Sequence, residues 1–259
     1  MPIETLVKSW DGAYSISATN LKTGDHVAWR EHEVMPSASL IKVPIMAEIF
    51  RRVEEEHLDL NETLVMTQED QVSGSGVLMD LTPGLRLSLR DLTTLMITVS
   101  DNTATNLLID YLGVDTVNQL MRRLGLNQTV LERRLQRVPT ERPRMNRTSA
   151  HDMTRLMELL ARGEVISARV SLQMVDILGR CQGPVSIAPL PPMSSVPGAL
   201  PQRTIAHKTG SLNEARHDSG IVSWMGGAYV ATIMSQGAPE SVLLKNITRL
   251  GRELYRILR

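Results

Sequence analysis

The chain has 259 residues, of which 42% are hydrophobic and 22% are charged, a balance that is ordinary for a soluble globular protein with one large core or two smaller ones. Its 28 basic residues equal its 28 acidic residues. A chain without net positive charge has no overall electrostatic attraction to nucleic acid or to an anionic membrane. A small-molecule or peptide partner is therefore favoured, and the sequence gives no indication of the oligomeric state.

The start of the chain and its single cysteine bear on compartment and redox chemistry. The opening MPIETLVKSWDG lacks the basic-then-apolar pattern of a secretory signal. As written, the sequence predicts a cytoplasmic location, or a secreted or periplasmic one if a leader has been removed.

Cys181 is the only cysteine, which excludes an intrachain disulfide, and we interpret it as a small packing residue. The six histidines show no metal-ligand spacing, so we predict no metal and no other cofactor.

Taken in chain order, the predicted elements begin with two short strands. Apolar residues alternate over 14–18 and 27–29, on either side of the turn at 22–25, which predicts a β-hairpin. The middle of the chain shows apolar residues at helical spacing, which predicts helices over 39–58, 89–100, 103–113, 115–125, 149–163 and 168–181. A proline-rich segment then leads to strands over 203–210, 219–225 and 228–235 and to a final helix over 240–259.

This order of elements predicts an α+β fold. Strands from both ends of the chain would form one five-stranded antiparallel sheet, in a discontinuous domain made of residues 1–35 and 200–259 with packed helices. Residues 36–199 would form an inserted all-helical domain. Because clefts commonly form where two such units meet, we expect the active site at their junction.

The stretch PSASLIKVPIM, residues 36–46, places Lys42 in an apolar segment three residues after Ser39. Three residues are most of one helical turn, so both side chains project from the same face. A serine hydroxyl becomes a good nucleophile when a neighbouring base takes its proton, and a desolvated lysine is such a base. The alternative is that Ser39 caps the helix while Lys42 extends to water.

Two further polar segments have both a chemical and a structural interpretation. Ser100-Asp101-Asn102 stands at the start of a predicted helix, where a polar N-cap is common. Lys208-Thr209-Gly210-Ser211 stands at the end of a predicted strand, where a hairpin turn is common. In this order, S-x-x-K, S-D-N and K-T-G form the signature of class A β-lactamases and penicillin-binding proteins. Residues 73–113 and 207–222 resemble class A β-lactamase segments along their whole length, so the chain resembles a class A β-lactamase-like serine hydrolase.

The resemblance implies roles for the first two motifs. Ser39 would attack the carbonyl of a β-lactam or ester, and Lys42 would act as base or as part of the proton relay. Ser100 would pass a proton to the departing nitrogen with help from Lys208. Asn102 would hydrogen-bond both Lys42 and the side-chain amide of the substrate.

The resemblance also implies a substrate-binding strand. Lys208, Thr209 and Ser211 would hold a substrate carboxylate, with Gly210 between them. The backbone N–H groups of Ser39 and Ser211 would form the oxyanion hole.

The chain departs from that family in the loop that removes the acyl group. Class A enzymes use a loop glutamate to activate the deacylating water, and the expected pattern is missing from residues 131–153. Glu132 is expected in a solvated ion pair, and Glu141, in a proline-bounded loop, is a weak candidate for the base. Three functions therefore stay open: a β-lactamase, an esterase, amidase or peptidase-like hydrolase on another substrate, and a slowly deacylating β-lactam-binding or sensor protein.

Overall fold

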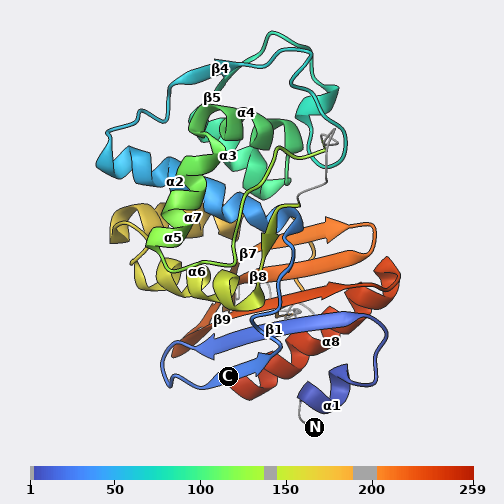
Figure 1. The fold of residues 1–259 in the computed structure, drawn as a ribbon. Coiled ribbons are helices and arrows are strands. Elements are labelled where there is room, and N and C mark those ends of the chain that lie inside the picture. Colours follow the sequence, from blue (N-terminus) through green and yellow to red (C-terminus); the bar gives the residue numbers. More distant parts are fainter. Residues whose placement is uncertain (1–2, 137–144, 189–202) are drawn as a thin grey trace, which may run out of the picture.

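The computed structural model describes residues 3–136, 145–188 and 203–259. A five-stranded antiparallel sheet with the strand order β2-β1-β9-β8-β7 lies at its centre (Figure 1). Two of the strands come from the N-terminal part of the chain and three from the C-terminal part. Their bounds are β1 Ala13–Asn20, β2 His26–Trp29, β7 Arg203–Leu212, β8 Ala215–Trp224 and β9 Gly227–Gln236. The predicted α+β fold with a sheet built from both termini is confirmed.

The strand β8 begins four residues before its predicted start at 219. Its first residues, ARHD at 215–218, show no apolar alternation, and the sequence therefore gives no strand signal there. They still pair with β7 on one side and β9 on the other, and most of them are buried. This extension places His217 and Asp218 next to the K-T-G segment.

Helices cover both faces of the sheet. The C-terminal helix α8, Glu240–Leu258, packs on one face together with the short α1, Ile3–Val7, and α6, Ala150–Arg162, packs on the other (Figure 1). Helix α1 has only five residues, too few for a periodic apolar pattern, and the sequence did not predict it. Within the described residues, no helix is both long enough and apolar enough to cross a membrane.

The middle of the chain folds into the predicted helices. They are α2 Lys42–Glu55, α3 Leu89–Thr98, α4 Asn102–Leu112, α5 Val114–Arg123, α6 and α7 Ala168–Gly179, with the short 3-10 helices η1 Ala38–Ile41 and η2 Leu78–Asp80. Two small antiparallel pairs join distant segments: β3 Met35–Pro36 with β6 Arg147–Thr148, and β4 Thr63–Val65 with β5 Arg86–Ser88.

The core of the helical region is continuous with one face of the sheet. Ala206, Ile221, Val230 and Met234 of the sheet belong to the same buried cluster as the side chains of α2 to α7. A second cluster lies on the opposite face, between the sheet, α1 and α8. The boundaries of the two expected domains stay a prediction, and the shared core means that the sheet and the helices position each other directly.

Helix α8 approaches the segment before the C-terminal strands very closely. Gly251 packs against the backbone of Ser186, and a Cβ at this position would overlap the Ser186 carbonyl oxygen. Gly179, the last residue of α7, has no atom within 4 Å of the position where its Cβ would be. The two glycines therefore differ in packing while both lie in helices.

We expect Gly251→Ala to lower the free energy of unfolding by at least about 1 to 3 kcal/mol, because the added methyl group must displace backbone. The matched control Gly179→Ala should change stability by no more than about 1 kcal/mol, and in the stabilising direction. Denaturant titration of both variants measures the difference. Equal stabilities would contradict the close approach of α8 to Ser186.

Candidate active site

Ser39 lies in η1, immediately before α2, on a segment that is tied to the sheet. The Pro36 carbonyl accepts a hydrogen bond from His217 Nε2 at 2.9 Å, and Ser37 N donates to Asn146 O at 2.8 Å. Burial lowers the pKa of His217 to about 4, so the ring is neutral near pH 7. Its Nδ1 accepts from Ser235 N at 3.2 Å, which leaves Nε2 to carry the proton. This contact fixes the backbone that presents Ser39.

Lys42 is completely buried, with a side chain that ends among three oxygen atoms. Its Nζ lies 2.5 Å from Ser100 O, 3.0 Å from Ser100 Oγ and 2.9 Å from Asn102 Oδ1. Burial lowers the pKa of Lys42 well below its ordinary value, the positive charge of Lys208 lowers it further, and Asp101 opposes both. Within the described chain, these contacts go to Ser100 and Asn102 and not to Ser39 Oγ. Lys42 therefore does not extend to water.

The turn between α3 and α4 carries Ser100 and Asn102 into the site. Ser100 has a positive φ of 58°, a conformation that costs energy for a residue other than glycine, and it turns its hydroxyl and its carbonyl toward Lys42. Asp101 caps α4 by accepting from Ala104 N at 2.8 Å. Both interpretations of this motif therefore hold in part: the middle residue is an N-cap, and its two neighbours face the site.

Asp101 also holds the glycine-rich loop at 73–76 in place. Its second carboxylate oxygen accepts from Val77 N at 2.7 Å and from Leu78 N at 2.9 Å. Gly76 packs onto this carboxylate with φ at +117°, where any Cβ would overlap Asp101. The loop carbonyls of Ser73 and Ser75 in turn accept from Asn102.

Lys208 lies on β7, which is an edge strand of the sheet, and is completely buried. Its Nζ lies 3.1 Å from Ser100 Oγ and 2.9 Å from Thr209 O. Burial lowers its pKa, and the charges of Cys181 and Asp218 oppose that effect. The adjacent Gly210 lets β7 approach η1, because a Cβ there would lie only 3.2 Å from that of Ala38. The K-T-G segment is therefore extended strand, and the turn to β8 follows it at 213–214.

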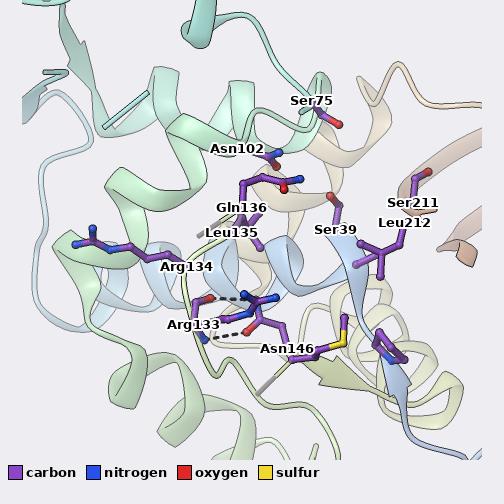
Figure 2. Close-up of a pocket in the computed structure, with 13 residues that line it drawn as sticks. Ser39, Ser75, Asn102, Arg133, Arg134, Leu135, Gln136, Asn146, Ser211 and Leu212 are labelled. Carbon is purple, nitrogen blue, oxygen red and sulfur yellow. Dashed lines mark hydrogen bonds between the residues drawn. The ribbon is translucent and has the colours of Figure 1, made fainter. Parts of the chain in front are cut away.

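A pocket opens in front of Ser39 (Figure 2). Figure 2 shows Leu135 and Gln136 between Asn102 and Arg133, with Ser39 and Ser211 on the opposite side. None of the described lining residues is acidic; they are Pro36, Ala38, Ser39, Ser75, Asn102, Arg133, Arg134, Leu135, Gln136, Met145, Asn146, Ser211 and Leu212.

The loop residues that face Ser39 are held by α4. Asn106 Oδ1 accepts from Leu135 N at 2.7 Å, and its Nδ2 donates to Leu135 O at 3.0 Å. Glu132 forms the expected ion pair, with Arg147, although it lies outside any helix and does not line the pocket. Glu141 lies outside the described residues.

The sequence does not predict Asn106 and Leu135 as parts of the site. Neither belongs to a motif; Asn106 lies in a predicted helix, and Leu135 lies outside the predicted elements. A buried asparagine in an apolar helix was the only available signal, since such an amide requires hydrogen-bond partners.

Comparison with known proteins gives the family. Residues 2–258 match the model of the beta-lactamase enzyme family, and the chain belongs to this family. A β-lactamase of Rhodobacter capsulatus is 27% identical over 260 residues, covering 92% of this chain and 82% of that protein. The β-lactamase SME-1 of Serratia marcescens is 25% identical over 172 residues, which span 65% of this chain and 58% of that protein.

Solved structures agree with this assignment. A β-lactamase from Sphaerobacter thermophilus is 27% identical with a TM-score of 0.87, covering 95% of this chain and 92% of that one. PBP-A is 30% identical with a TM-score of 0.85, and the match covers 98% of this chain and 92% of that one. A mutant of PBP-A, solved as an acyl-enzyme complex with penicillin G, is 29% identical with the same TM-score. That match covers 98% of this chain and 93% of the mutant chain. The chain is therefore a serine β-lactamase-like hydrolase, as the sequence predicted.

Proposed function

We propose that this protein hydrolyses β-lactams through an acyl-enzyme on Ser39, with acylation much faster than deacylation. The observation that carries the proposal is the Ser100 hydroxyl, which lies between the buried amines of Lys42 and Lys208 beside the pocket of Ser39. The substrate is a small molecule, and it would bind in the pocket in front of Ser39.

Burial of Lys42, which lowers its pKa, supports a neutral amine, and its contacts can accommodate one. A neutral amine has two N–H groups and one lone pair, and two of its three neighbours, the Ser100 carbonyl and Asn102 Oδ1, only accept hydrogen bonds. The lone pair is then left for the Ser100 hydroxyl, whose oxygen accepts from Lys208. In this state Lys42 is ready to take the Ser39 proton once substrate draws the Ser39 hydroxyl toward it.

The same arrangement provides the return path of the proton. Ser100 donates to the leaving nitrogen of the opened ring and is reprotonated from Lys42. Lys208 stays charged, and together with Thr209 and Ser211 it binds the substrate carboxylate. The N–H groups of Ser39 and Ser211, on η1 and on the edge strand β7, stabilise the oxyanion.

The wall of the pocket supports slow deacylation. Hydrolysis of the acyl-enzyme requires a base that activates water, and the described lining residues include no carboxylate. Leu135 occupies the wall opposite Ser39, with its backbone fixed by Asn106. An apolar side chain at this place neither orients water nor accepts a proton. The acyl-enzyme is then long-lived, and turnover begins with a burst.

The test is a time course of the intact protein's mass with benzylpenicillin. We expect one penicilloyl adduct to form quickly and to disappear slowly as free protein returns. Ser39→Ala should form no adduct while keeping the native fold, because one small side chain replaces another. An adduct on the Ser39→Ala variant would refute the assignment of the nucleophile. No adduct on the wild type would exclude β-lactams and leave the esterase and peptidase alternatives.

We expect the two buried lysines to respond differently to arginine. Lys42→Arg keeps a positive charge but removes the proton acceptor, because guanidinium does not deprotonate, so acylation should fall about 10²- to 10⁴-fold. Lys208→Arg retains the charge that binds the substrate carboxylate, so it should lower the acylation rate clearly less than Lys42→Arg does. Rapid-quench measurement of the burst rate compares them. Small and equal losses would show that Lys42 is only structural.

Replacing Leu135 should change deacylation specifically. Leu135→Glu places a carboxylate on the pocket wall at a backbone position held by two hydrogen bonds, and we expect deacylation to rise by about 10²-fold or more. Leu135→Gln has the same length without the charge and should leave the acyl-enzyme as long-lived as in the wild type. The decay of the adduct mass measures both. Equal rates in the two variants would contradict the proposed cause of slow turnover.

A further inference from the structure

His217 on β8 is a buried side chain that contacts three other segments of the chain. Its Nδ1 accepts from Ser235 N of β9 at 3.2 Å, and its Nε2 donates to the Pro36 carbonyl at 2.9 Å. On β7, Gly210 lies so close that a Cβ there would be 3.2 Å from His217 Cδ2. The imidazole therefore links the sheet to the segment that precedes Ser39.

Both hydrogen bonds require the neutral imidazole with its proton on Nε2. The Ser235 N–H group only donates, and the Pro36 carbonyl only accepts. Burial lowers the pKa of His217 to about 4, although the hydrogen bond to Pro36 opposes this shift. The two bonds are therefore present together near pH 7.

The backbone immediately before the nucleophile is strained. Ala38 has a φ of 46°, in the left-handed region that residues other than glycine rarely adopt. A conformation of this kind persists only where the surrounding structure holds it in place. Here the Pro36 carbonyl is held by His217, and Ser37 N donates to Asn146 O at 2.8 Å. Both residues before Ala38 are thus fixed from outside the segment.

The same imidazole reaches both segments that carry the expected oxyanion donors. Ser39 follows Ala38 on η1, Ser211 follows Gly210 on β7, and both serines line the pocket (Figure 2). His217 packs against the residue before Ser211 and binds the carbonyl three residues before Ser39. Two N–H groups stabilise a developing oxyanion only when both point at the same oxygen. The relative position of these two segments therefore matters for the rate.

We propose that His217 is a positioning residue for the acylation of Ser39. Its hydrogen bond to the Pro36 carbonyl holds Ala38 in the strained conformation. The N–H group of Ser39 then points to the oxygen that the N–H group of Ser211 also binds. This inference rests on the proposed function, because that oxygen belongs to the β-lactam carbonyl. His217 transfers no proton and does not touch the substrate, so it affects the acylation step and not the binding of the substrate carboxylate.

Two amide variants separate the two hydrogen bonds of His217. In His217→Gln the amide nitrogen reaches the place of Nε2, so the bond to Pro36 is kept and the bond to Ser235 is lost. In His217→Asn the shorter amide places its oxygen where Nδ1 lies, so the bond to Ser235 is kept and the bond to Pro36 is lost. Both amides are neutral, as His217 is. Circular dichroism verifies the fold of each variant.

The first experiment needs no substrate. Hydrogen exchange, followed by mass spectrometry of peptides that cover residues 36–42, reports the amides of Ser37 and Leu40, which donate to Asn146 O and Ser37 O. We expect exchange in this segment to be faster in His217→Asn than in the wild type, because the segment is released. His217→Gln should exchange at nearly the wild-type rate. Equal exchange in His217→Asn and the wild type would overturn the proposal.

The second experiment measures acylation. The burst with benzylpenicillin, measured by rapid quench over a range of concentrations, gives the limiting acylation rate and the dissociation constant separately. We expect His217→Asn to lower the limiting rate about 10²-fold, as misplaced oxyanion donors do, and to leave the dissociation constant nearly unchanged. His217→Gln should lose much less.

The control for this measurement is Gly251→Ala, which lowers stability far from the pocket and should keep the wild-type limiting rate. Equal losses in the two His217 variants, or a loss in the dissociation constant alone, would contradict a positioning role. Absence of any burst in the wild type would refute the proposed function. The exchange comparison would then still decide whether His217 holds the segment.

A third comparison tests the strained residue itself. Glycine adopts a positive φ without the cost that alanine has, so Ala38→Gly makes the segment less dependent on His217. We expect His217→Asn to lower the limiting acylation rate less in the Ala38→Gly background than in the wild-type background. This background also serves if His217→Asn alone does not fold. The same loss in both backgrounds would refute the link between His217 and Ala38.

Discussion

Two completely buried lysines that share one serine hydroxyl are the constraint on which the rest of this structure depends. Lys42 and Lys208 approach Ser100 Oγ to 3.0 and 3.1 Å from opposite sides. Two ammonium groups at this separation inside a protein repel each other strongly and have lost their hydration. Burial lowers the pKa of both lysines, and the charge of Lys208 lowers that of Lys42 further. In the proposed function, this burial makes Lys42 the base that Ser39 requires.

Holding these groups together requires segments that are distant in the sequence. Ser39 and Lys42 come from the η1–α2 junction, Ser100 from the turn between α3 and α4, and Lys208 from the edge strand β7. Small residues allow the close approaches: Gly210 brings β7 against η1, and Gly76 lets the loop pack on Asp101. Because the sheet and the helices share one core, their relative position is fixed by packing and not by a linker.

Two features near the three motifs differ in their effect: Leu135 on the pocket wall, and the buried His207–Asp218 pair next to Lys208. On the wall, Asn106 fixes the backbone of Leu135, so that a well-ordered position presents an apolar side chain to the acyl group. Behind Lys208, the ion pair of His207 and Asp218 provides charge compensation in a region without water access. In the proposed function the first feature sets how long the acyl-enzyme lasts, while Asp218 opposes the lowering of the pKa of Lys208 by burial. The proposal therefore gives roles to residues outside the three motifs.

The amino-acid sequence by itself determined the fold class, the order of helices and strands and the family. Helical and strand periods are local, and the three motifs are short runs of chemically demanding residues, so both are readable without coordinates. The burial of Lys42 was also readable, from its apolar neighbours. Only the tertiary structure decided which atoms meet. The start of β8 at Ala215, the place of Leu135 in the pocket wall and the pairing of His207 with Asp218 all depend on contacts that form only when the chain folds. An isolated leucine carries no pattern, because its role is set by neighbours that the chain brings to it only when it folds.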